Sequence, residues 1–284
     1  MEYRYLGRSG LQVSVLTMGT MTFGGSGVFA KVGNTDAAGA TRQIDLALDV
    51  GVNLIDTANA YSGGLSEEII GQAMKGRWNR TLIATIRLGD GGFNLGVSPD
   101  GQRVYATTAG GRVYVIATSS NTVVDSLTVG SAPNGVAFSP GGRTVYISSR
   151  DAGTVTAFNT STLQQVAVYL VGGAPQRLAV SPSGSTLYAA NEVHGLDVVN
   201  LSTGTVTEAA GLSTGYGLGQ TPDGTQLWVT SPLEGVIYIV DPTTNSVTRT
   251  LNLGTEIVPR NVAFSADGKT AVVTNGAGSV LFFK

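Results

Sequence analysis

Few side chains in this sequence could carry out acid–base or metal chemistry. The chain has one histidine, His194, and no cysteine, which excludes disulfides, thiolate metal sites and cysteine nucleophiles. Glu192 lies two residues before His194, and such a pair could serve as a base in a lyase or hydrolase. A lone loop histidine is more often simply solvated, and no second histidine supports a metal ligand set. We therefore predict no metal site.

The charge balance limits the classes of partner. Only 13% of the residues are charged and the formal net charge is -2, so there is no basic surface for nucleic acid or for an acidic membrane. No segment reaches about 18 apolar residues, and the opening residues lack the apolar core of a secretion signal. We expect no nucleic-acid or membrane partner and a cytoplasmic location.

The elements that would position these side chains come from a repeat. A Ser/Thr-Pro/Ala-x-Gly turn occurs five times, 40 to 44 residues apart, beginning at Ser98, Ser139, Ser181, Thr221 and Ser265. Each turn lies between two short apolar segments, such as 135–138 and 144–147, and two more segments complete the unit. Their β-branched and aromatic residues, bounded by Gly, Asp and Asn, predict hairpins. Four strands per repeat are typical of a propeller blade.

The repeats resemble the YVTN family of β-propellers. The matching residues are Val129-Gly130 with Pro133, then Ser98-Pro99-Asp100-Gly101, and Leu187-Tyr188-Ala189-Ala190-Asn191. The resemblance extends from about residue 81 to residue 284 and recurs five times in register. Many members of that family have seven blades, whereas this chain has five repeats.

These patterns predict a mainly β fold. We expect a five-bladed propeller of four-stranded antiparallel blades over residues 81–284, preceded by a small α/β segment over residues 1–80. The last repeat ends after its third strand, 279–283, while residues 82–86 align with the fourth strands of other repeats. Pairing of these two segments would close the ring and remove an exposed edge.

One face of the predicted propeller collects polar side chains. The innermost strands present Asn94, Gly135, Arg177, Gly217 and Asn261 at equivalent positions. The loops between second and third strands contribute Arg150, Asp151, Glu192, His194 and Glu234. Asn and Gly before a strand are also common turn residues. If the propeller binds a protein or small molecule, we expect contact at Asn94, Arg150, Arg177, Glu192, His194 and Asn261.

The first eighty residues follow a different pattern. Thr35-Asp36 precedes a segment, 37–50, that predicts a helix ending at Gly51. Its expected apolar side consists of Ile44, Leu46, Ala47, Leu48 and Val50. A strand over 52–56 and a second helix over 66–75 follow. The segment therefore reads as two β/α units, not as a propeller blade.

This segment resembles the start of an aldo-keto reductase. The matching stretches are Tyr5–Leu11, Leu16–Gly24, Gly51–Tyr61 and Ser66–Gly71. The resemblance implies a (β/α)8 barrel that reduces carbonyls with NADPH through an Asp, Tyr, Lys and His set. It assigns Asp56 and the proton donor Tyr61 to that set, and Gly19, Thr20 and Met21 to the segment beside the nicotinamide.

The sequence departs from that family at residue 86. Ile86 stands where the family has its lysine, Arg87 comes one place late, and the histidine strand is absent. Without the lysine, Tyr61 should keep a pKa near 10 and be a weak acid at neutral pH. We therefore expect no cofactor, or NADPH if the N-terminal segment is functional.

Three functions remain open. The expected one is a non-catalytic binding or scaffold propeller that carries an incomplete aldo-keto reductase-like segment, as in a fusion or chimera. The second is an NADPH-dependent oxidoreductase of the aldo-keto reductase type acting on carbonyls, and the third is a propeller lyase or hydrolase. Two barrel units leave parallel strands with open edges, so we expect the N-terminal segment to dock on the propeller, to self-associate with another copy, or to be only marginally ordered.

Overall fold

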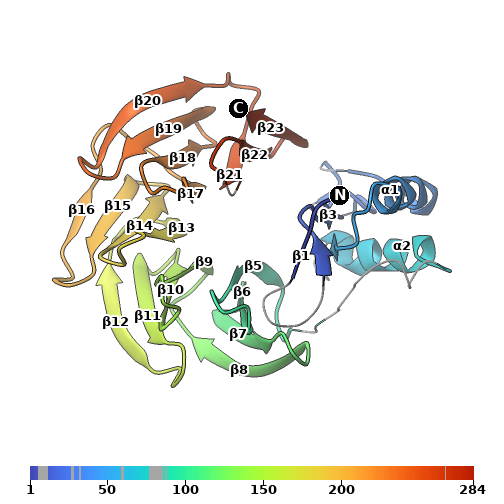
Figure 1. Ribbon diagram of the computed structural model, residues 1–284, viewed down its shortest axis with the longest axis horizontal. Coiled ribbons are helices and arrows are strands. Elements are labelled where there is room, and N and C mark those ends of the chain that lie inside the picture. Colours follow the sequence, from blue (N-terminus) through green and yellow to red (C-terminus); the bar gives the residue numbers. More distant parts are fainter. Residues whose placement is uncertain are drawn as a thin grey trace. The chain divides into compact units, whose positions relative to one another are not determined.

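A computed structural model describes residues 1–5, 12–26, 29–31, 33–58, 61–76, 86, 88–265 and 267–284 (Figure 1). The chain forms two compact units. The first holds Met1–Gly92 with Asp100–Val104 and Ile116–Val124, and the second holds the rest. The predicted boundary at residue 80 lies outside the described residues and stays a prediction.

The N-terminal segment contains two β/α units, as predicted. Its elements are β1 (Tyr3–Tyr5), β2 (Gln12–Ser14), β3 (Met18–Gly19), α1 (Ala37–Asp49), β4 (Ile55–Asp56), a 3-10 turn (Tyr61–Gly64) and α2 (Leu65–Ala73). Strands β3 and β4 pair in parallel, while β1 and β2 form an antiparallel pair. The described part of the chain has no helix with the length and hydropathy of a membrane span.

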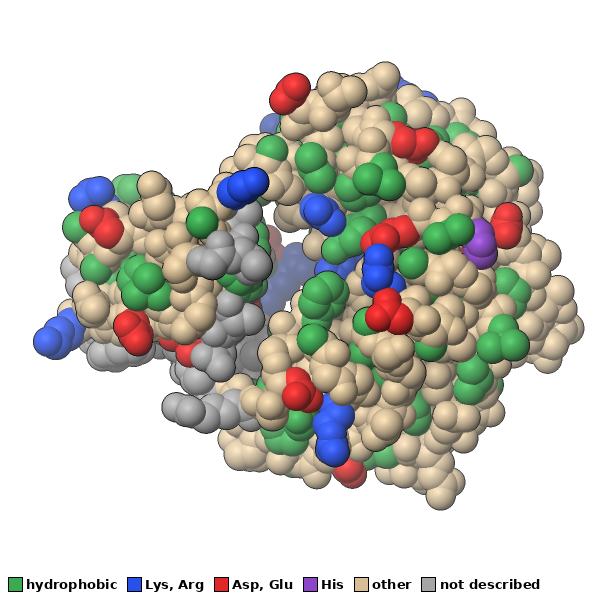
Figure 2. Space-filling model, turned by 180° about the vertical axis from the view of Figure 1, so that it is seen from behind, with side chains coloured by type: hydrophobic (Ala, Val, Ile, Leu, Met, Phe, Trp, Pro, Cys, Tyr) green, Lys and Arg blue, Asp and Glu red, His purple; other side chains and the backbone are tan. Residues whose placement is uncertain are grey.

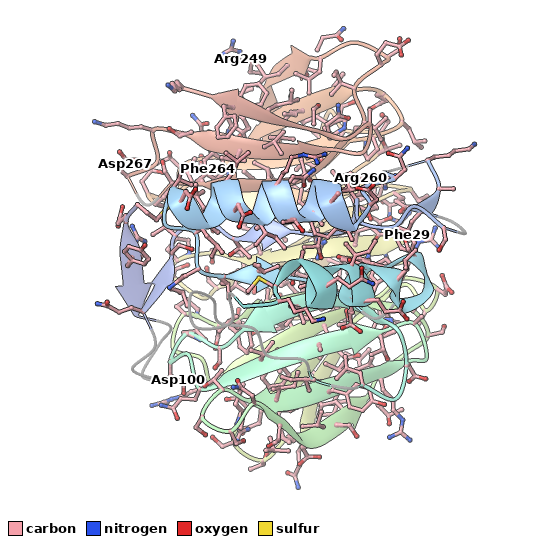
Figure 3. The ribbon with its side chains drawn as sticks, turned by 90° about the vertical axis from the view of Figure 1, so that its right-hand side faces the viewer. Phe29, Asp100, Arg249, Arg260, Phe264 and Asp267 are labelled. Carbon is pink, nitrogen blue, oxygen red and sulfur yellow. The ribbon has the colours of Figure 1, made fainter. Side chains whose placement is uncertain are left out.

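Helix α1 begins where a side chain caps it and ends before a glycine. Asp36 accepts a hydrogen bond from the Gly39 amide at 2.7 Å, which satisfies one of the free donors of the first turn. Gly51 has φ +90°, a conformation that favours glycine after a helix. The helices α1 and α2 lie side by side (Figures 1 and 3).

The apolar side predicted for α1 is correct at only some positions. Ile44 and Leu48 are buried in the core between the helices and β4, together with Ala40. Leu46 and Val50 are exposed instead. Residues four apart share a helix face, so 40, 44 and 48 form one stripe, and 46 and 50 lie on another.

The remaining strands form five sheets in succession (Figure 1). The first two consist of β5 (Gly92–Val97), β6 (Arg103–Thr108), β7 (Arg112–Ala117) and β8 (Thr122–Thr128), then β9 (Pro133–Phe138), β10 (Thr144–Ser149), β11 (Thr154–Asn159) and β12 (Gln165–Leu170). The third and fourth consist of β13 (Pro175–Val180), β14 (Thr186–Asn191), β15 (Gly195–Asn200) and β16 (Val206–Glu208), then β17 (Leu218–Gln220), β18 (Leu227–Ser231), β19 (Val236–Asp241) and β20 (Ser246–Asn252). The fifth consists of β21 (Pro259–Phe264), β22 (Ala271–Asn275) and β23 (Ser279–Phe283).

The predicted five-bladed propeller is confirmed. Successive strands are neighbours in each sheet, and the registers given for the second to fifth blades are antiparallel. The fifth blade has three strands in the described part of the chain. Residues 82–85, which we expect to pair with residues 279–283, lie outside that part, so ring closure stays a prediction.

The repeated turn motif joins the first and second strands of each blade. In the second blade, Gly142 donates its amide to the Ser139 carbonyl at 2.8 Å, and the Thr144 amide donates to Ser139 Oγ at 3.1 Å. Ser181, Gly184 and Thr186 repeat both contacts in the third blade. Gly142 has φ +68°, which explains the glycine of the motif. The motif is therefore structural.

Hydroxyl groups link neighbouring blades. Ser148 Oγ accepts the Gly135 amide of its own blade at 2.7 Å and donates to the Gln176 carbonyl of the next at 2.6 Å. Thr230 Oγ1 makes the same pair of contacts with Gly217 and Arg260. Both hydroxyl-bearing residues are fully buried. Each hydroxyl therefore satisfies main-chain groups that no strand ladder reaches.

Two glycines on the innermost strands occupy positions where a larger side chain would not fit. A Cβ on Gly96 would lie 2.4 Å from Val136 Cγ1, and one on Gly219 would lie 2.9 Å from Val262 Cγ1. The restriction therefore comes from the adjoining blade, because the innermost strands of neighbouring blades approach closely.

The two terminal blades expose faces that the inner blades bury. Leu95 in β5 is 58% exposed, whereas Leu178 and Leu218 at the equivalent positions are 8% and 9% exposed. Phe282 in β23 is 66% exposed. Thr274, the counterpart of Ser148 in the fifth blade, accepts the Asn261 amide but is exposed. Among the described residues, the first and last blades therefore each expose apolar side chains that have buried counterparts in the inner blades.

The hydroxyl links predict a position-dependent effect on stability. Ser148→Ala should lower the free energy of unfolding by about 1–3 kcal/mol, because it leaves two buried main-chain groups unpaired. Thr274→Ala removes the equivalent but exposed hydroxyl and should change it by less than about 0.5 kcal/mol. Urea unfolding followed by circular dichroism would measure both. Equal losses in the two variants would contradict the bridging role.

Candidate functional site

A polar network crosses the loop face between the second and third blades. Arg150, in the loop after β10, pairs with Asp151 at 3.0 Å and with Glu192, after β14, at 3.1 Å. Glu192 also accepts a hydrogen bond from Gln176 Nε2 at 2.5 Å, and Gln176 Oε1 accepts one from Asn134. The structure thus brings two predicted ligand-face residues, Arg150 and Glu192, into one network.

The two ends of this network differ in burial. Asn134 and Gln176 are buried in the innermost strands, whereas Arg150 and Asp151 are exposed. The hydrogen bond to Glu192 and its negative charge raise the pKa of Arg150. Figure 2 shows acidic and basic side chains close together near the centre of this face. The buried amide side chains of Asn134 and Gln176 fix the position of Glu192. Arg150 and Asp151, at the other end of the network, are accessible to solvent.

A second polar group spans the innermost strands of the third to fifth blades. Arg177 Nε donates to Asn261 Oδ1 at 2.9 Å, which joins β13 to β21. Burial lowers the pKa of Arg177, partly offset by Tyr216. Arg260, on the same strand as Phe264 (Figure 3), stacks its guanidinium over the Tyr216 ring at 4.7 Å. Arg177 and Asn261 are therefore brought together.

Asn94 and Glu234, also predicted on the loop face, make hydrogen bonds within the propeller. Asn94 Nδ2 donates to the Asn134 carbonyl at 3.1 Å, which links the first two blades. Glu234 accepts hydrogen bonds from Ser213, Ser231 and Tyr238 within the fourth blade. Burial alone would raise the pKa of Glu234, but these hydrogen bonds outweigh it and lower the pKa.

His194 and Glu192 have separate partners. His194 Nδ1 lies 3.4 Å from Asp197 Oδ1 and 3.8 Å from Glu208 Oε1, while Glu192 contacts Arg150 and Gln176. Burial raises the pKa of Asp197 to about 6, against the lowering effects of Asn191 and His194. Figure 2 shows the histidine beside an acidic side chain.

Sequence reasoning missed Asp197 and Glu208. They are register partners on β15 and β16, and only strand pairing brings them together. A signal was present in the sequence. Asp197 is a carboxylate within the apolar third strand of its blade, and the residues at the same position in the neighbouring blades are Thr156 and Tyr238. An isolated carboxylate within such a strand indicates a special role.

The N-terminal candidates Asp56 and Tyr61 lie close enough to affect each other. Burial raises the pKa of Tyr61, and the negative charge of Asp56 raises it further. Burial also raises the pKa of Asp56. Phe29 (Figure 3) packs edge-on against the Tyr61 ring with centroids 5.6 Å apart. Tyr61 is therefore a weaker acid than an ordinary tyrosine.

The segment expected beside a nicotinamide has largely structural contacts. Thr20 Oγ1 donates to the Asp56 carbonyl at 2.8 Å, and Ser66 Oγ donates to the Thr20 carbonyl at 2.9 Å. Nothing lies within 4 Å of a Cβ built on Gly19, and Met21 is exposed. Thr20 is therefore held by contacts with neighbouring strand and helix residues, whereas Gly19 and Met21 are open to solvent.

Two known protein families match different parts of the chain. Residues 15–109 match the Aldo/keto reductase family, and residues 104–209 match the family described as Lactonase, 7-bladed beta-propeller. Neither match covers half of the chain. The first continues past residue 85 into β5 and β6, which belong to the first blade.

Two curated relatives, both from Bacillus subtilis (strain 168), match the N-terminal segment. The Uncharacterized oxidoreductase YrpG is 49% identical over 76 residues, which is 25% of this chain and 21% of that protein. The Aldo-keto reductase YhdN is 40% identical over 87 residues, or 30% of this chain and 25% of that protein. The chain therefore spans a quarter or less of the length of these relatives.

Solved structures match the propeller. Hydrazine synthase of Kuenenia stuttgartiensis gives a TM-score of 0.61 at 20% identity, covering 68% of this chain and 58% of that chain. The Cps50 (Swd1) β-propeller domain of Myceliophteria thermophila gives 0.61 at 13% identity, covering 69% and 65%. At these identities the likeness shows the fold alone. The chain carries an aldo/keto reductase-like segment at its N-terminus, joined to a five-bladed β-propeller that is similar to lactonases over its first three blades.

Proposed function

We propose that this protein is a non-catalytic binding or scaffold module. Its propeller would present the loop face around Arg150 and Glu192 to a protein or small-molecule ligand, and its N-terminal segment would be an incomplete reductase. The observation that carries this proposal is the environment of Tyr61, whose pKa is raised by burial and by Asp56.

A reductase of this type needs an environment that lowers the pKa of its tyrosine. A proton donor works best when its pKa lies near the working pH, and a cation beside the phenol would lower that pKa. Here Ile86 occupies the position of the family's lysine, and the nearby charge is the carboxylate of Asp56. The resemblance to YrpG and YhdN therefore supports common descent more than a shared activity.

The loop face has the features of a prepared binding surface. Its charged groups come from loops of two adjacent blades, which rigid strands hold in place. Gln176 and Asn134 anchor Glu192 from the buried side, so little ordering is needed on binding. Because Arg150 is exposed and pairs with Asp151 and Glu192, this surface offers one positive and two negative groups to a ligand.

A propeller hydrolase is the second candidate, favoured by the match of residues 104–209 to a lactonase family. The separate partners of Glu192 and His194 weigh against their acting as one catalytic pair. Hydrolysis of a simple lactone that is lost in both His194→Ala and Glu192→Gln would favour this candidate.

The proposal predicts that NADPH does not bind. Titration of the purified chain to millimolar NADPH should give no saturable change in nicotinamide fluorescence and no thermal stabilisation. A specific ligand at one hundred times its Kd would add about 2.7 kcal/mol. Saturable binding that Asp56→Ala and Tyr61→Phe both lose would overturn the proposal and establish the oxidoreductase reading.

Tyr61 should ionise only above about pH 10, its ordinary value. Ultraviolet titration of the wild type minus Tyr61→Phe would isolate its phenolate signal. The stability that the neutral phenol contributes is fully present below about pH 10 and is lost as the pH rises through the higher folded value. Tyr61→Phe should therefore lose less stability at alkaline pH. Ionisation of Tyr61 near neutral pH would instead indicate a catalytic acid.

Binding at the loop face should depend on its charges. In a thermal-shift screen of carboxylic acids, amines and sugars, stabilisation by any hit should disappear in the double variant Arg150→Ala, Glu192→Ala. Arg249→Ala, on the outermost strand of the fourth blade (Figure 3), is the control and should retain it. Hits that persist in the double variant would place the binding surface elsewhere.

A further inference from the structure

Three side chains of the third blade converge on one point. His194 lies in the loop before β15, Asp197 on β15 and Glu208 opposite it on β16. One ligating atom from each lies within 4.8 Å of the other two. The His194 Nδ1 atom is 3.4 Å from Asp197 Oδ1 and 3.8 Å from Glu208 Oε1. An imidazole and two carboxylates thus face each other.

Two of these atoms lack hydrogen-bond partners. His194 Nδ1 and Asp197 Oδ1 are both buried and face each other at 3.4 Å, and beyond this ion pair neither atom has a hydrogen-bond partner. The Asp197 side chain is only 1% exposed. Buried polar atoms in native proteins are nearly always paired. A long contact with no further partner on either atom therefore indicates that both can bind a third atom beside them.

The separations suit ligands of one metal ion. Bonds of about 2.0–2.2 Å in a tetrahedral zinc site place neighbouring ligand atoms roughly 3.3–3.6 Å apart. The separation of His194 and Asp197 falls in this range. Glu208 lies slightly farther from His194 and is 63% exposed, so its side chain can adjust.

The surroundings of Asp197 support the same role. Asn191 Nδ2 donates to Asp197 Oδ2 at 2.7 Å, which leaves Oδ1 directed at His194. Metal-binding carboxylates commonly have such an outer hydrogen bond, which orients the ligating oxygen. Asn191 is itself fully buried, so it holds Asp197 in a fixed position.

We infer that His194, Asp197 and Glu208 form a binding site for a divalent transition-metal ion, with Zn²⁺ as the preferred one. Mixed nitrogen and oxygen ligands suit zinc, whereas Mg²⁺ and Ca²⁺ take oxygen ligands. Three protein ligands leave one position of the ion open to water or to a ligand. The site is independent of the binding proposed for the loop face.

The composition of the chain leaves few other side chains that could bind zinc. The protein has one histidine and no cysteine, so a chain without an affinity tag offers no other imidazole and no thiolate ligand for zinc. Isothermal titration of the chelator-treated full chain should show one Zn²⁺ bound per chain. Mg²⁺ and Ca²⁺ should bind at least about tenfold more weakly, because their preferred ligands are oxygens.

Single substitutions test which side chains bind the metal ion. His194→Ala and Asp197→Asn should each weaken zinc binding at least about tenfold, a loss that even outer-shell changes produce. Glu208→Gln should also weaken it, and because Glu208 is exposed the variant should fold normally. The control Glu256→Gln, in the exposed loop after β20, should bind like the wild type.

Nuclear magnetic resonance of the single imidazole identifies the ligating atom. Zinc should shift the Nδ1 signal of His194 and leave Nε2 protonated. Absence of saturable zinc binding by the wild type would overturn the site. Unchanged affinity in His194→Ala or Glu208→Gln, or coordination through Nε2, would do the same, and the buried atoms would then share a water or a proton.

Discussion

Each inner blade of the propeller packs between two neighbouring blades that cover its faces. Buried clusters contain residues from adjacent blades, such as Tyr146 with Leu187 and Tyr188 with Leu227. Removing this apolar surface from water is the main favourable contribution to such a fold. Ser148 and Thr230 add hydrogen bonds across the same junctions. The terminal blades lack this cover on one side, so Leu95 and Phe282 are exposed.

Packing between blades and strand pairing within a blade each bring polar side chains together. Packing of adjacent blades aligns their loops, which places Arg150 against Glu192 although 42 positions separate them in the chain. Strand pairing within one blade instead places Asp197 opposite Glu208. The first kind is an accessible surface network. The second is a partly buried cluster, in which His194 Nδ1 and Asp197 Oδ1 have no hydrogen-bond partner beyond their ion pair.

The N-terminal segment shows what a barrel fragment retains. Its helices still pack on the short parallel pair of β3 and β4 through Phe23, Ile44 and Ile69. The local contacts that orient Thr20 and Ser66 are also present. Active sites on complete barrels of this type draw on residues from several strands, whereas this segment contains two β/α units.

The sequence by itself determined the repeat, the turns and the two resemblances. Period-2 patterns and the glycine of each turn depend on local geometry, which a sequence displays directly. Tertiary structure alone decided which polar side chains meet. It separated His194 from Glu192, joined Arg177 to Asn261 and brought Asp197 to Glu208. The physical reason is that hydrogen bonds and burial depend on distances across strands and blades, and no local pattern encodes those distances.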